Sequence, residues 1–216
     1  MHSTNRHDTP QNQARGKVYA LLSDLFAREI DSQSLQRLTS PEAQAFFDLL
    51  AADPQLATSI GQLRQKLSSL NSERELLELA ADYCSLFLVG GKLSANPYAS
   101  LYLSQAEQAN TLLFGEQHQS MLETLAQSQL QLHKDFPEPA DHIAVILAYV
   151  AHQACQRDDA SQLAFIAPNL NAWLASFADQ VAKVDKGTFY GALAQLTKLW
   201  VQADCEALCE HSSKNQ

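Results

Sequence analysis

The chain has 216 residues, of which 46% are apolar and 18% charged, and its formal net charge is −9. This length is sufficient to bury a core without disulfide bonds, and the apolar content is too high for a disordered protein. The excess of 24 Asp and Glu over 15 Lys and Arg argues against a binder of DNA or RNA, which needs clustered cations, and favours basic partners.

The composition predicts an all-α fold. Only 7 glycines and 7 prolines occur, which leaves few residues for tight turns, and no segment alternates apolar and polar residues long enough to require a sheet. Four cysteines in a chain of this length do not suggest a disulfide framework, so reduced thiols are expected. The start of the chain is polar, and the longest apolar stretch, residues 143–151, is too short to span a bilayer. We therefore expect a cytoplasmic protein without a membrane segment.

Helices are expected throughout the N-terminal part. Apolar residues recur at helical spacing in four segments: residues 17–26, 41–53, 56–67 and 75–89. Ser40 and Pro41 supply an N-cap and a first-turn proline for the second segment, and Ser72 opens a capping box for the fourth. The Gly90-Gly91 pair is expected to end that fourth helix.

A loop is expected after the glycine pair. Residues 92–100 contain Pro97 and Tyr98 and show no helical period. Loops of this kind often carry function. Two further helices are then expected, a short one over residues 104–113 and another over residues 121–133.

Residues 134–141 form the strongest internal boundary. The segment contains two prolines, which push the residues before them away from helical geometry. Beyond it, apolar stripes predict helices over residues 143–150, 163–168, 170–181 and 189–208. We therefore predict a helical bundle of about nine to ten helices in two subdomains, residues 1–133 and 142–216, joined by a proline-containing hinge. Contacts across such a hinge can also form between two copies, so we expect a monomer and a domain-swapped homodimer.

Asp141 and His142 form the most suggestive polar pair. A carboxylate in the first turn of a helix is stabilised by the helix dipole, and a neighbouring histidine can hold or pass a proton. Together with His152 on the same predicted helix, the pair could serve a small metal-dependent or acid–base enzyme. The residues around them provide neither a complete metal-ligand set nor a nucleophile. A surface pair at a helix start and a carboxylate that binds a cationic peptide are the other two interpretations.

Apolar and aromatic residues bracket the predicted loop. Tyr83 and Phe87 have the spacing of residues on one face of a helix, which is more typical of a core than of a ligand site. Pro97 and Tyr98 have no helical period that would explain their apolar character. Rigid apolar residues on a loop suit the capture of a peptide in a groove.

Two motifs occur in a fixed order: Tyr83-x-x-Leu86-Phe87 followed by Pro97-Tyr98, and then Glu138-Pro139-Ala140-Asp141-His142. In this order they resemble the TorD family of redox-enzyme maturation chaperones. The resemblance extends over most of residues 15–210.

The resemblance implies an all-helical cytoplasmic chaperone with no enzymatic activity, no catalytic residues, and no cofactor or metal of its own. Its expected partners are the twin-arginine leader and the cofactor-free form of a molybdoenzyme, trimethylamine N-oxide reductase. Such a chaperone assists insertion of the molybdenum cofactor and delays export. Weak GTP binding is also implied, although the segment around Gly90, Gly91 and Lys92 lacks the other residues of a phosphate-binding loop.

The family's binding positions carry over to six residues: Leu86 and Phe87 in an apolar wall, Pro97 and Tyr98 in the loop, and Asp141 and His142 at the hinge. A twin-arginine leader combines two guanidinium groups with an apolar stretch. Its receptor should therefore offer carboxylates beside an apolar groove, because guanidinium–carboxylate hydrogen bonds are bidentate and charge-assisted. We expect such a groove where the two subdomains meet, with Asp141 and Tyr98 close together.

Overall fold

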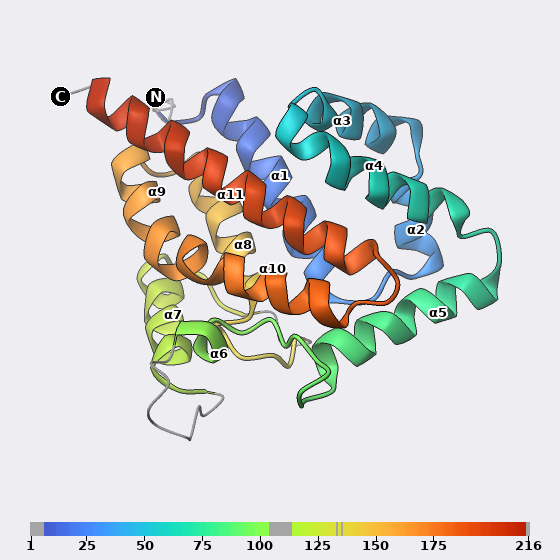
Figure 1. Ribbon diagram of the computed structural model, residues 1–216. Coiled ribbons are helices and arrows are strands. Elements are labelled where there is room, and N and C mark those ends of the chain that lie inside the picture. Colours follow the sequence, from blue (N-terminus) through green and yellow to red (C-terminus); the bar gives the residue numbers. More distant parts are fainter. Residues whose placement is uncertain (1–6, 104–113, 133, 135, 215–216) are drawn as a thin grey trace. The chain divides into compact units, whose positions relative to one another are not determined.

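Helices dominate the computed structural model, which describes residues 7–103, 114–132, 134 and 136–214 (Figure 1). Within these ranges the one strand-like feature is an isolated antiparallel bridge between Tyr98 and His142. The prediction of an all-α fold is confirmed. Across the same residues, no helix combines the length and the apolar character that crossing a bilayer requires.

The chain forms two compact units. Unit 1 comprises Met1–Ala27, Pro97–Trp173 and Asp204–Gln216, and unit 2 comprises Arg28–Asn96 and Leu174–Ala203. These units group the chain differently from the predicted subdomains, and the predicted hinge at residues 134–141 falls inside unit 1. Motion about that hinge stays a prediction.

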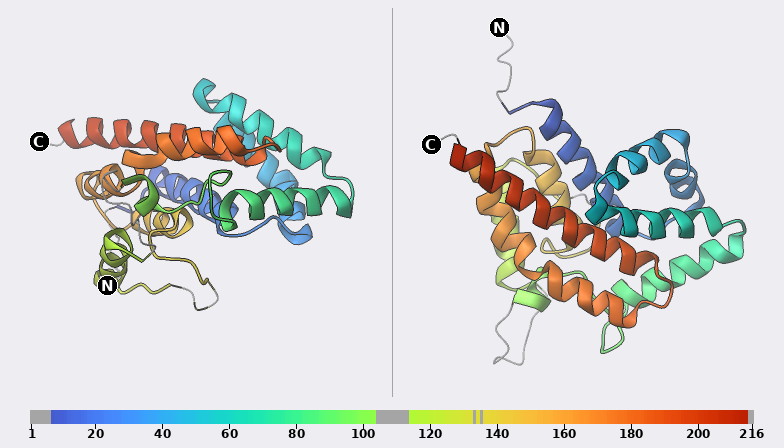
Figure 2. Two further views of the ribbon diagram at one scale, coloured as in Figure 1. Left: turned by 60° about the horizontal axis from the view of Figure 1, so that its bottom comes forward. Right: turned by 45° about the horizontal axis from the view of Figure 1, so that its top comes forward.

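In the described part of unit 1, six helical segments lie wholly within the unit: α1 (Pro10–Ala27), α6 (Ala99–Leu103), α7 (Glu116–Gln127), α8 (Ile143–Gln153), α9 (Asp159–Ile166) and the π-helical η2 (Ala167–Asn171). Helix α8 is apolar on most of its faces, as expected of a buried helix. It packs beside α1 (Figures 1 and 2), and the Ser23 hydroxyl of α1 donates to the Ala144 carbonyl oxygen at 2.8 Å. A Cβ at Gly16 would lie 3.2 Å from the Ala151 carbonyl oxygen, so glycine permits this close approach.

A buried ion pair joins α1 to the unit 1 part of α11 (Phe189–Lys214). The Arg15 guanidinium donates to both carboxylate oxygens of Asp204, from Nε at 2.5 Å and from Nη2 at 2.8 Å. The Tyr19 hydroxyl donates a third hydrogen bond to Asp204, at 2.8 Å. Because the Arg15 and Asp204 side chains are only 8% and 4% exposed, each charge depends on the other for compensation.

Unit 2 contains five complete helical segments: α2 (Ser32–Leu38), α3 (Pro41–Ala51), α4 (Pro54–Ser69), α5 (Glu73–Tyr83) and the π-helical η1 (Cys84–Leu88). Each of the first four begins at an N-cap residue whose side-chain oxygen accepts a hydrogen bond from a backbone N–H of the first turn. These N-cap residues are Asp31, Ser40, Asp53 and Ser72. Two of these caps, Ser40 and Ser72, match the predicted helix starts. Helix α10 (Ala172–Val184) and helix α11 each have residues in both units.

Several predicted helix boundaries differ from the structure. Helix α2 was not predicted, and the helix expected over residues 121–133 already ends at Gln127 in α7. Gln129 has a φ of 57°, in the left-handed region, which is incompatible with continuing that helix. The short helix expected over residues 104–113 lies outside the described residues.

Candidate functional site

The second motif ends at the start of α8. His142 is the N-cap, and its Nδ1 accepts the Ala144 N–H at 3.1 Å. Asp141 precedes this cap, so the expectation of a carboxylate in the first helical turn is wrong. Burial lowers the pKa of His142 to about 3. The imidazole is therefore neutral near pH 7, the protonation state in which Nδ1 can accept a hydrogen bond.

Asp141 and Ile143 hold residues 97–100 against the second motif within unit 1. Oδ2 of Asp141 accepts the Ser100 N–H at 3.0 Å, and its carbonyl oxygen accepts the Ala99 N–H at 3.0 Å. A third bond runs from the Ile143 N–H to the Pro97 carbonyl oxygen at 2.8 Å. The other carboxylate oxygen of Asp141, Oδ1, is buried and accepts no hydrogen bond from the described residues. The carboxylate thus holds the start of α6 and keeps one acceptor unused.

Tyr98 lies against the same segment. Its hydroxyl donates a short hydrogen bond to the Glu138 carboxylate, and its ring meets the His142 ring edge-on at 5.4 Å between centroids. Phe136 meets His142 at 5.3 Å, also edge-on. The structure therefore brings Pro97, Tyr98, Asp141 and His142 together in unit 1.

Leu86 and Phe87 belong to η1 of unit 2. Phe87 is fully buried, and its ring centroid lies 5.3 Å from that of Tyr83 and 5.2 Å from that of Tyr190. Leu86 is 3% exposed. In this conformation the two side chains are part of an aromatic and apolar core, the more frequent role of such spacing.

All six predicted binding residues are buried in the structure. Asp141 and His142 are each 1% exposed and Tyr98 is 7% exposed. These side chains hold segments of the fold together here, and they offer little surface to a peptide. A binding surface must therefore be sought beside them or in a conformation that opens them.

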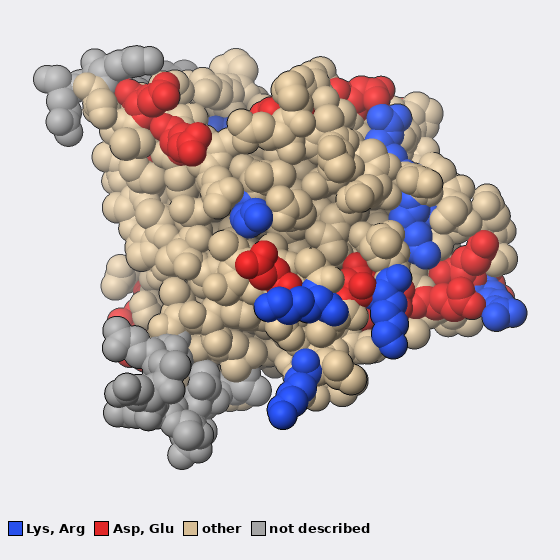
Figure 3. Space-filling model, viewed as in Figure 1, with Lys and Arg blue, Asp and Glu red and all other residues tan. Residues whose placement is uncertain are grey.

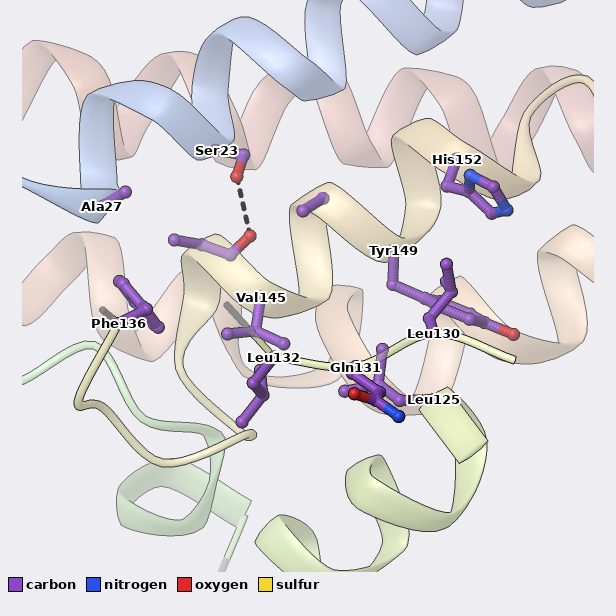
Figure 4. Close-up of a pocket in the computed structure, with 12 residues that line it drawn as sticks. Ser23, Ala27, Leu125, Leu130, Gln131, Leu132, Phe136, Val145, Tyr149 and His152 are labelled. Atoms are coloured by element: carbon purple, nitrogen blue, oxygen red, sulfur yellow. Dashed lines mark hydrogen bonds between the residues drawn. The ribbon is translucent and has the colours of Figure 1, made fainter. Parts of the chain in front are cut away.

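An apolar pocket of about 320 Å³ lies in unit 1 beside the second motif. Its walls come from the end of α1, from α8, and from Leu125, residues 130–132 and Phe136. In Figure 4 the side chains of Val145 and Tyr149 point from α8 towards Leu132 and Leu130. Phe136 lines the pocket, and its ring also contacts the ring of His142. Because His142 belongs to the second motif, the motif helps to position one wall of this pocket.

Sequence reasoning missed this pocket. Four of its residues on α8, namely Val145, Ala148, Tyr149 and His152, recur at helical spacing, which is the signal that could have revealed it. The predicted core stripe of the same helix occupies its other side. Only a tertiary structure shows that Leu125, residues 130–132 and Phe136 face this second stripe and leave space there.

The three residues of the alternative enzyme do not converge. Asp141 and His142 lie at the start of α8, whereas His152 lies in its last turn, about 15 Å away along the helix axis. His152 is exposed at the pocket, while the other two are buried. Among the residues that the structure describes, no three His, Cys, Asp or Glu side chains gather as metal ligands would.

Charged side chains on the face drawn in Figure 3 are interspersed. Lys and Arg lie singly or in small groups there, several of them beside carboxylates, rather than in one continuous basic patch. This distribution differs from the basic stripe typical of a nucleic-acid interface.

Comparisons with known proteins give the family. The model of the nitrate reductase delta subunit family matches residues 50–179. A relative from Shewanella loihica named chaperone protein TorD is 61% identical over 201 residues, which cover 93% of this chain and 95% of the relative. A relative of the same name from Colwellia psychrerythraea is 44% identical over 219 residues, covering 92% of this chain and 93% of its own.

The fold is also similar to a solved structure. The crystal structure of a proposed redox enzyme maturation protein from Archaeoglobus fulgidus matches with a TM-score of 0.53 and 20% identity, covering 86% of this chain and 93% of that one. At this identity the match supports the fold alone. The sequence matches confirm the resemblance noted from the two motifs, and the chain belongs to the TorD family of redox-enzyme maturation chaperones, within the nitrate reductase delta subunit family.

Proposed function

We propose that the protein is a cytoplasmic chaperone, without enzymatic activity, that binds the twin-arginine leader and the cofactor-free form of trimethylamine N-oxide reductase. It would assist insertion of the molybdenum cofactor and delay export of this client. Membership of the TorD family supports the class of function. The structural observation that carries the proposal is the open apolar pocket beside the second motif.

The pocket suits the apolar stretch of a leader. Its volume of about 320 Å³ is at the lower end of the range for ligand pockets, and burying one large apolar side chain there contributes about 1.5–3 kcal/mol. Micromolar affinity needs about 8 kcal/mol after the ordering costs are met. Polar contacts to the arginines must therefore add to the apolar contact.

Asp141 is the carboxylate we assign to a leader arginine. Its Oδ1 accepts no hydrogen bond from the described residues, and a charge-assisted bond to a guanidinium is among the stronger hydrogen bonds in proteins. Access to Asp141 requires residues 97–100 to separate from residues 139–143, which breaks the three hydrogen bonds between them. The other five predicted residues contribute by shaping this region (Pro97, Tyr98, His142) and the unit 2 core (Leu86, Phe87).

Calorimetric titration with a synthetic twin-arginine leader tests the proposal. Ala148 is exposed and lines the pocket, so Ala148→Phe should fill the space without disturbing the core. We expect micromolar binding by the wild-type protein and a loss of about tenfold or more in Ala148→Phe, the equivalent of burying one large side chain.

Ala20→Phe is the matched control, because Ala20 is also exposed in unit 1 and does not line the pocket. It should bind the leader like the wild type. Absence of leader binding by the wild-type protein would contradict the function. Equal affinities of Ala148→Phe and Ala20→Phe would contradict the pocket.

Two further parts of the proposal concern assembly and nucleotide. Exchange of helices about residues 134–141 would produce a domain-swapped homodimer beside the monomer. Size-exclusion chromatography with light scattering tests this, and a monomer at every concentration would refute it. Weak GTP binding is tested by the same calorimetry with GTP in place of the leader.

A further inference from the structure

A second apolar groove lies entirely within unit 2. It has a volume of about 600 Å³ and runs between the start of α2, with the residues just before it, and residues 70–80, which include most of α5. Leu35, Leu70 and Leu76 are among its apolar lining residues, and Leu77, which also lines it, is 62% exposed. A leucine that remains this exposed beside an apolar groove is available to a partner.

The charged side chains that line this groove are all acidic. They are Glu29, Asp31 and Glu73, each exposed, and neither Lys nor Arg is among the lining residues. None of the three forms an ion pair within the described residues. Their negative charge is therefore not compensated by a salt bridge in the described part of the chain.

Two of these carboxylates also lie at helix starts, where the helix dipole offsets part of their charge. Asp31 is the N-cap of α2 and accepts the Ser34 N–H at 2.7 Å, which lowers its pKa, and Glu73 lies in the first turn of α5. A helix start carries a partial charge of only about +0.5. Arg28 and Arg37 also help to lower the pKa of Asp31, but neither lines the groove. Among the lining residues, two helix starts leave three carboxylates net negative, and Glu29 lies outside both helices.

From this combination we infer that the unit 2 groove is a second peptide-binding site, which takes an amphipathic partner segment carrying Lys or Arg beside its apolar side chains. The apolar side chains would cover Leu76 and Leu77, and the cations would meet the acidic rim. Such an interface follows the helix-in-groove mode, in which apolar anchors supply affinity and charge supplies orientation. This groove is separate from the apolar pocket of unit 1 that we assign to the leader, since the two share no lining residue.

The test uses the full-length protein and two short synthetic amphipathic helical peptides with the same leucines. One carries lysines beside the leucines, and the other carries glutamates in their place. We expect calorimetry to show the lysine peptide binding, with an affinity that falls as salt rises. Equal affinity for the glutamate peptide, or no binding of the lysine peptide, would overturn the inference.

Location is tested by a matched pair of variants. Leu77→Arg places a cation in the groove, whereas Leu49→Arg places one on another exposed leucine of unit 2, 74% exposed and outside the groove. Both variants change the net charge equally, so general attraction to an acidic protein affects them alike. We expect Leu77→Arg to bind the lysine peptide about 10- to 100-fold more weakly than Leu49→Arg, the range for loss of one buried leucine contact.

Rim charge is tested separately by Glu29→Gln, with Glu42→Gln on α3 as its control. The expected loss is about 1.4- to 5-fold for Glu29→Gln alone, as for an exposed ion pair. Equal affinities of Leu77→Arg and Leu49→Arg would overturn the inference while leaving the leader titration unaffected, since that titration depends on Ala148.

Discussion

Replacing Asp141 by alanine tests whether the second motif acts as a structural clamp. The substitution removes the acceptor of the buried Ser100 N–H, which lies 3.0 Å from Oδ2. A hydrogen bond to a charged group contributes about 1.5–3 kcal/mol, more than the 0.3–1 kcal/mol (approximate) of an acid in an exposed first turn. We therefore expect Asp141→Ala to lower the free energy of unfolding by about 1.5–3 kcal/mol.

Urea unfolding followed by circular dichroism measures this loss, and a thermal melt should show a fall in Tm of about 3–12 °C for a chain of this size. Asp141→Asn keeps an acceptor oxygen and should cost less than about 1 kcal/mol. Asp24→Ala, at an exposed carboxylate of α1, is the control and should stay within about 0.5 kcal/mol of the wild type. If Asp141→Ala left the free energy of unfolding unchanged, or if Asp141→Asn were as unstable as Asp141→Ala, the structural role of Asp141 would be refuted.

Three further substitutions test other contacts by the same unfolding measurement. Asp204→Ala leaves Arg15 buried without its partner and should cost about 3–5 kcal/mol, whereas Glu78→Ala, at an exposed ion pair, should cost less than about 1 kcal/mol; similar losses would contradict this contrast. The pKa of His142 falls from 6.5 to about 3 on folding, so the unfolded chain binds more protons between these values and stability drops as the pH falls. From pH 7 to pH 5 the wild type should lose about 2 kcal/mol more than His142→Asn, which can cap α8 without titrating, and parallel losses would refute this. Tyr98→Phe removes the hydrogen bond to the Glu138 carboxylate and should lower the free energy of unfolding by about 0.5–1.5 kcal/mol; no change would mean that this bond is not stabilising.

The helical fold could be predicted because the signals for it are local. Apolar spacing and capping residues such as Ser40 and Ser72 determine where several helices begin. Helix α2 was missed because it has seven residues and only two apolar ones, Leu35 and Leu38, which is too short for a clear period. Its cap, Asp31, was the available local signal.

The candidate site was less predictable, because burial and pocket shape are tertiary properties. Apolar spacing around Phe87 is the same for a core residue and for a groove residue, and the structure shows a core residue. The pocket beside α8 depends on residues 130–132 and Phe136 facing Val145 and Tyr149. No local pattern in the sequence specifies that arrangement. The order of the two motifs did indicate the family, and with it the class of function.

Hydrogen exchange of the full-length protein, with and without a saturating twin-arginine leader, tests the central claim most directly. Backbone amides covered by a bound segment exchange more slowly. Leader binding at the unit 1 pocket should slow exchange in residues 125–132 and in α8, relative to the free protein. Protection confined to other helices, or none at all, would contradict a leader site beside the second motif.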